Sequence, residues 1–385
     1  MSKTKSLSDS GEQSDGPIFS QATPSPSRLG RRSFLKRLGW GGTAMIPAAA
    51  LLSSNLPARA DKRGGPSPGG LSRGDAAILR FLAAVEYLET DFWQQYTELA
   101  LGNAAYQQAL QVLDGDMPTY LNQNTRDEFT HRDFLNAYLE SKGRPGVNLE
   151  PFRTLPSSQA TGANKTAKRL TNLMNLTVDT SWYLKYRSAG NPDFGDTFPQ
   201  LVSLVNVPTI PDSDLPANSD AIQFIANAAA FHFAAFEQAG MSVYDSFLPK
   251  ATSREVIKIL AAIGGSEVMH FQIWHDKAGN APPVPAATGA LFPQLPIAPD
   301  QTPNGIDPAS PQDTNQVMPL PCKFISTSLP LCSVVRPTST QHAGAVAAAK
   351  AVAGSGLFEG QSTAFFDLVL SLAAAADEAR GERDE

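Results

Sequence analysis

The chain has 385 residues, of which 42% are hydrophobic, so it is long enough to build a substantial core and is not disordered throughout. Residues 1–60 carry eight Lys/Arg and three Asp/Glu, and without them the formal charge falls from −6 to −11. An acidic protein with no basic stripe is unlike proteins whose main partner is nucleic acid or an anionic bilayer, because both of these bind clustered positive charge.

The first 60 residues predict export. Arg31 and Arg32 precede a mildly apolar stretch, 38–52, and Ala58-Arg59-Ala60 supplies the small residues that a signal peptidase needs. The stretch contains glycines and a proline and falls short of the ~20 strongly apolar residues of a membrane span. The pattern resembles a twin-arginine signal peptide cleaved after Ala60. This resemblance implies that the twin-arginine export machinery carries the folded protein to the periplasm or another extracytoplasmic compartment.

Four long helices are predicted after a Gly/Pro/Ser-rich, flexible leader at 61–74. Apolar residues recur at helical spacing, and Gly or Pro residues mark where the helices stop. The expected helices span about 75–101, 118–141, 219–248 and 252–279. They define an all-α domain over 75–278.

The connections between these helices differ in length. About 75 residues separate the second helix from the third, which suits the long crossover of a four-helix bundle, and 167–176 is a candidate helix within it. Thr252-Ser-Arg-Glu255 has the pattern of a capping box at the start of the fourth helix. These features favour two helix pairs joined by a long crossover.

The C-terminal third has a different composition. Residues 281–340 hold 13 of the 30 prolines, which predicts a Pro-rich extension over 279–340, and an amphipathic helix is expected at 357–376 within a C-terminal helical segment, 341–385. Cys322 and Cys332 lie in the extension. In an oxidising compartment they predict a structural disulfide, and the absence of a nearby His or further Cys argues against a zinc site.

Two of the predicted helices carry the same short motif. The second contains Glu128-Phe-Thr-His131 and the fourth contains Glu267-Val-Met-His270. Residues three apart share one helix face, so each Glu and His can reach a common point. The motif is common by chance on surface helices, but two copies on alternate helices favour a functional pair.

The other two helices each carry a glutamate with apolar flanks. Glu86 lies in the first helix and Glu237 in the third, and an aromatic residue follows each seven positions later, Trp93 and Tyr244. The order Glu, Glu-x-x-His, Glu, Glu-x-x-His is the ligand pattern of a di-iron or di-manganese carboxylate bundle. Four carboxylates balance the +4 charge of two divalent ions, and two imidazoles leave coordination positions open for oxygen or peroxide.

These motifs resemble the ferritin-like superfamily over residues 75–278, and in particular its exported branch of desiccation-related proteins. The resemblance implies a four-helix bundle with a long crossover and a centre of two iron or manganese ions. Residue by residue, it places the metal ligands at Glu86, Glu128, His131, Glu237, Glu267 and His270.

Some assignments stay open at this stage. Glu89 shares a helix face with Glu86 and is the alternative ligand from the first helix. His232 and His275 lie off the ligand face and are expected to be second-layer or surface groups. The aromatic residues of these helices are expected to belong to the core, and Tyr244 is the one to consider for a radical or electron path.

Two functions from different classes follow from this pattern. The first is redox chemistry at a di-metal centre that reacts with oxygen or hydrogen peroxide, as in a ferroxidase, peroxidase or catalase. The second is a non-enzymatic stress or envelope protein that keeps the bundle without catalysis. The long crossover and the Pro-rich extension disfavour a ferritin cage, whereas a homodimer stays open.

Overall fold

The computed structural model describes residues 70–285, 318–338 and 344–379. The described part of the chain is mostly helical, which confirms the predicted all-α fold. The predicted signal peptide lies outside the described residues, together with most of the predicted leader and the middle of the Pro-rich extension.

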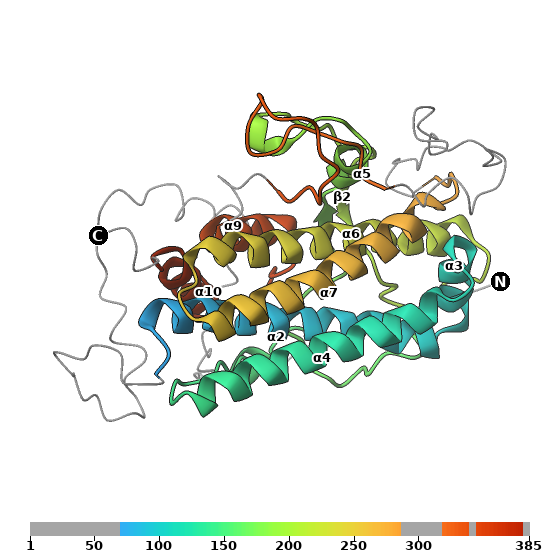
Figure 1. Ribbon diagram of the computed structural model, residues 1–385. Coiled ribbons are helices and arrows are strands. Elements are labelled where there is room, and N and C mark those ends of the chain that lie inside the picture. Colours follow the sequence, from blue (N-terminus) through green and yellow to red (C-terminus); the bar gives the residue numbers. More distant parts are fainter. Residues whose placement is uncertain (1–69, 286–317, 339–343, 380–385) are drawn as a thin grey trace, which may run out of the picture.

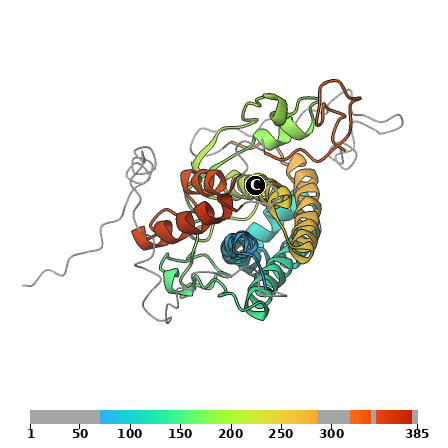
Figure 2. The same cartoon turned by 60° about the vertical axis from the view of Figure 1, so that its left-hand side comes forward.

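Four long helices form the body of the molecule (Figure 1). They are α2 (Arg73–Gly102), α4 (Met117–Ser141), α6 (Asp220–Phe247) and α7 (Arg254–Gly279). Helix α2 packs along α4, and α6 packs along α7. Viewed closer to end-on, the two pairs enclose a common core (Figure 2). Each helix was expected from the sequence, with ends within about three residues of those observed.

Local hydrogen bonds explain where two of these helices begin. The hydroxyl of Ser72 accepts a hydrogen bond from the backbone N–H of Asp75, and Ser219 caps α6 in the same way at the N–H of Ile222. Such caps satisfy N–H groups that have no partner within the helix. Helix α6 ends before a short 3-10 turn, η3 (Leu248–Lys250), because Pro249 cannot continue the hydrogen-bond ladder.

The predicted capping box of α7 is wrong. Ser253 is the cap residue and its side chain makes no capping bond. The hydroxyl of Thr252 instead bonds to the carboxylate of Asp75 at 2.6 Å, and Glu255 pairs with Lys142. Long-range partners therefore replace the local pair. By length and composition α7 is apolar enough to cross a membrane, but it buries its apolar face against α6 as a core helix does.

The crossover from α4 to α6 is built of short elements rather than one long helix. It contains η1 (Glu150–Phe152), β1 (Leu176–Val178), α5 (Ser181–Tyr186), η2 (Pro192–Phe194) and β2 (Leu204–Val207). The two strands pair antiparallel, with Leu176 opposite Val207. The candidate helix at 167–176 is wrong, because Arg169 pairs with Leu155 in an isolated bridge and the chain then enters β1.

Three further helices complete the described structure. Helix α3 (Ala104–Leu113), which follows α2, was not anticipated, and neither was α9 (Ala345–Ser355). Helix α10 (Thr363–Asp377) corresponds to the expected terminal helix but begins six residues later than predicted. Helix α10 packs on α2 and on α9, so the C-terminal segment covers one side of the bundle (Figure 2).

The predicted disulfide is absent. Backbone hydrogen bonds pair Cys322 with Cys332 in an antiparallel bridge, yet both thiols are free. The Cys322 thiol is buried near the side chain of Asn191, whereas that of Cys332 is exposed and lies 3.8 Å from the carbonyl of Ser333. The two sulfur atoms therefore have different surroundings.

Candidate metal centre

The bundle core brings together all six side chains that the sequence singled out. They form two groups in which one donor atom from each residue lies within 4.8 Å of the others. The first group is Glu86, Glu128, His131 and Glu267; the second is Glu128, Glu237, Glu267 and His270. Glu128 and Glu267 belong to both groups, so each could be shared by two adjacent cations.

Helix periodicity explains this convergence. Glu128 and His131 stand one turn apart on the inner face of α4, and Glu267 and His270 do the same on α7. Glu86 comes from α2 and Glu237 from α6, so each of the four long helices contributes. The four carboxylates are at most 1% exposed. The carboxylates are therefore shielded from bulk water, whereas the side chain of His131 is 11% exposed.

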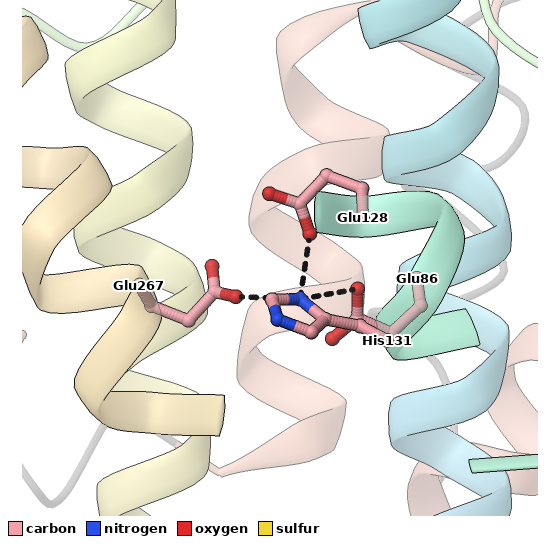
Figure 3. Close-up of side chains that lie close together, drawn as sticks. All are labelled: Glu86, Glu128, His131 and Glu267. Atoms are coloured by element: carbon pink, nitrogen blue, oxygen red, sulfur yellow. Dashed lines mark hydrogen bonds and ion pairs between the residues drawn. The ribbon is translucent and has the colours of Figure 1, made fainter. Parts of the chain in front are cut away.

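The first group is centred on the His131 ring (Figure 3). Its Nδ1 atom lies 3.1 Å from Glu128 Oε2, 3.5 Å from Glu267 Oε1 and 3.7 Å from Glu86 Oε2. One nitrogen thus faces carboxylates from three different helices. A cation at this point would meet the same oxygens.

The second group repeats the arrangement around His270. Its Nδ1 atom lies 3.1 Å from Glu128 Oε1 and 3.4 Å from Glu237 Oε2. The other ring nitrogen, Nε2, lies 3.2 Å from a carboxylate oxygen of Asp127. A carboxylate at the far nitrogen is the usual way to orient a metal-binding histidine.

Protons occupy part of this centre when it holds no cation. Burial raises the pKa of Glu86 to about 7, against the opposing effect of His131, and it raises the pKa of Glu267 well above its usual range. Burial also acts on Glu128, but the hydrogen bonds and charges of the two histidines outweigh it and lower its pKa to about 2. The carboxylates overcome the desolvation of His131 and raise its pKa to about 10.

The donor set fits a pair of transition-metal ions. Among the described residues, Oε2 of Glu267 has no hydrogen-bond or ion-pair partner. Oε1 of Glu267 and Oε2 of Glu86 and of Glu237 have no hydrogen bond either and meet only a histidine nitrogen, at 3.5, 3.7 and 3.4 Å. Unpartnered buried carboxylate oxygens are costly unless a cation or proton satisfies them. Carboxylates with imidazoles suit iron, manganese or zinc. The groups are compatible with metal binding, and the occupancy and identity of the metal stay predictions.

Asn124 and Tyr244, together with Asp127 described above, hold the ligands of the centre in place. The Asn124 amide donates to Glu128 at 2.7 Å and to Glu237 at 3.1 Å, and its oxygen accepts from the Trp274 indole at 2.8 Å. The hydroxyl of Tyr244 donates to Glu86. Sequence reasoning had noted Tyr244 but missed Asn124 and Asp127. Asn124 lies four residues before Glu128, and Asp127 lies four residues before His131, so helical spacing was the available signal for both.

The remaining candidates lie outside the two groups. Glu89 is 2% exposed, and burial raises its pKa well above the usual range, but it belongs to neither group. His232 and His275 are buried rather than on the surface. His232 lies 3.0 Å from the Tyr96 hydroxyl, and His275 packs among the rings of Tyr183 and Tyr186.

Comparison with known proteins agrees with this geometry. A family model described as a ferritin-like domain matches residues 74–280, more than half of the chain. Neither the search of curated proteins nor the search of solved structures gave a match.

Proposed function

Since the chain belongs to the ferritin-like domain family, we propose that it binds two iron or manganese ions in the bundle core and uses them in redox chemistry with oxygen or peroxide. The observation that carries the proposal is the pair of donor groups that share Glu128 and Glu267. A shared carboxylate can bridge two cations and so hold them close together.

When bound, such ions supply one-electron redox chemistry and open positions for a small oxidant. The protein contributes the other requirements. The buried carboxylates balance the charge of the ions. Asn124 fixes the orientation of Glu237, and Asp127 fixes that of His270. Tyr244 holds Glu86 by a hydrogen bond and lies close enough to exchange a proton with it. Burial of the four carboxylates limits the water that would compete for the open positions.

The proposal includes the location of the protein. Arg31 and Arg32, the apolar stretch after them and Ala58-Arg59-Ala60 support export by the twin-arginine machinery, with mature protein beginning at Asp61. Export of a folded protein would allow its metal to be chosen in the cytoplasm. The resemblance to desiccation-related proteins supports a role in oxidative or drying stress at the cell envelope.

Metal analysis tests the proposal directly. Mature protein exchanged into Fe(II) or Mn(II) without oxygen should retain about two ions per chain after gel filtration, and addition of oxygen or peroxide should oxidise them. Protein that retains no iron, manganese or zinc would contradict the proposal. That outcome would favour a non-enzymatic stress protein that keeps only the bundle.

A further inference from the structure

An apolar cavity of about 50 Å³ lies beside the metal centre, under the C-terminal helices. Helices α2 and α6 form its floor, and α9, α10 and Phe358 form its roof. Its lining is Phe81, Val85, Leu88, Glu89, Phe236, Ala239, Gly240, Val243, Ala348, Ala349, Val352, Phe358 and Val369. Glu89 is the single charged residue among them, and none of the six candidate ligands lines the cavity.

Gly240 lines the cavity and also lies directly against the centre. A Cβ atom placed on Gly240 would lie 2.8 Å from Oε2 of Glu267 and 3.6 Å from Oε1 of Glu89. Because this residue has no side chain, the cavity wall at Gly240 consists of backbone alone, beside a carboxylate that belongs to both donor groups. Any larger residue here would stand between the cavity and Glu267.

The outer end of the cavity adjoins an open groove of about 470 Å³. Phe236, Ala239 and Val352 line both spaces. The groove lies over α6, α9 and the strands β1 and β2, and its lining includes polar groups such as Asp179 and Gln200. An outer groove with some polar groups in its lining therefore adjoins an apolar inner chamber across three shared side chains.

The size and lining of the chamber select its occupant. A buried water needs two to four polar partners, and the lining offers only one polar side chain, the carboxyl of Glu89, so the chamber favours an apolar occupant over water. A volume of about 50 Å³ admits a molecule of a few heavy atoms and excludes a ring. Dioxygen is small and apolar and meets both conditions.

We propose that the chamber roofed by α9 and α10 is a dioxygen-binding passage that opens on the metal centre at Gly240. The C-terminal helices then have a specific role, which is to shape this passage. The role of this passage rests on the metal centre proposed above, whereas the presence of the chamber does not depend on a metal.

Xenon tests the passage without any metal. Crystals of the metal-free protein under xenon pressure should show a xenon atom in the chamber, because xenon occupies dry apolar cavities. Ala349→Leu, which places a larger side chain in the chamber, should remove that atom, whereas Ala347→Leu on the same helix does not face the chamber and should keep it. Val369→Phe fills the chamber from α10 and should act like Ala349→Leu. A wild type without xenon in the chamber would overturn the proposal.

Oxidation kinetics test the connection to the centre. In protein loaded with Fe(II), Ala349→Leu and Val369→Phe should slow oxidation by dioxygen about tenfold, while Ala347→Leu matches the wild type. Oxidation by hydrogen peroxide, which is polar, should change little in all variants. Equal slowing with both oxidants, or no slowing with dioxygen, would refute the passage. Failure of the wild type to bind metal would refute the proposed function instead, and the xenon experiment would still decide whether the chamber admits a gas.

Discussion

Replacement of Glu267 by glutamine should abolish both metal positions at once. Glu267 belongs to both donor groups, whereas Glu237 belongs to one. Glu267→Gln keeps the size of the side chain and removes its charge and one of its two coordinating oxygens. Glu237→Gln is the matched control, because it makes the same chemical change at a carboxylate that serves a single position.

The size of the effect follows from binding linkage. A ligand at 100 times its dissociation constant stabilises the folded protein by about 2.7 kcal/mol. In a domain of this size each kcal/mol shifts the melting temperature by about 2–4 °C, so metal should raise that of the wild type by about 5–10 °C. Glu267→Gln should show almost none of this rise, and Glu237→Gln should retain part of it together with about one bound ion.

Without metal, the same substitution should have the opposite effect on stability. Both oxygens of Glu267 are buried without a hydrogen-bond partner, and burial raises its pKa well above the unfolded value near 4.5. The folded wild type therefore loses stability relative to a neutral glutamine as pH rises above 4.5. The metal-free variant should equal the wild type at low pH and exceed it by about 1–3 kcal/mol at higher pH.

Thermal melts with and without Fe(II) or Mn(II), together with metal counts by elemental analysis, decide the matter. Two retained ions and a full metal-induced rise in Glu267→Gln would refute its placement as a bridge. Loss of both ions in Glu237→Gln as well would show that the two positions cannot be filled separately.

Three further predictions concern other parts of the chain. Metal affinity should rise with pH up to about pH 10, and most steeply below about pH 7, because Glu86 and His131, with pKa values raised to about 7 and 10, must release protons to the solvent when a cation binds. Calorimetry in buffers of different ionisation enthalpy would detect this release, and a pH-independent affinity would contradict it. Asn124→Ala should destabilise the protein by about 1–3 kcal/mol in denaturant unfolding, since it leaves buried groups without their partner, and it should weaken metal binding; unchanged values would exclude a positioning role. Replacement of Arg31 and Arg32 by lysine should leave the precursor in the cytoplasm, and fractionation that finds mature protein outside the inner membrane would refute this export route.

The long helices and the convergence of the six side chains could be anticipated because both depend on helix periodicity. Apolar spacing fixes which face of a helix is buried, and a Glu and a His three residues apart must share that face. The choice between Glu86 and Glu89 could not be made this way, because both lie on the inner side of α2 and both are buried. Only packing against α4 and α6 sends Glu86 to His131 and Glu89 to the chamber beside Gly240.

The errors lie where long-range contacts override local patterns. Thr252 has the local sequence of a helix cap, but Asp75 from a distant helix captures its hydroxyl. Helix α3 had a usable signal that was overlooked, since the Asn103 side chain caps it and apolar residues recur at helical spacing within it.

The two halves of the centre are related in sequence but differ in chemistry. The aromatic residue seven positions after Glu237 is Tyr244, whose hydroxyl reaches across the bundle to Glu86. Its counterpart after Glu86 is Trp93, whose indole N–H has no hydrogen-bond partner among the described residues. Asn124 instead supplies a donor to Glu237. One position thus has a phenol beside its terminal carboxylate and the other an amide, so the hydroxyl proton of Tyr244 is available at Glu86 and has no counterpart at Glu237. Two ions bound here would therefore be inequivalent, and proton transfer would accompany chemistry on the Glu86 side.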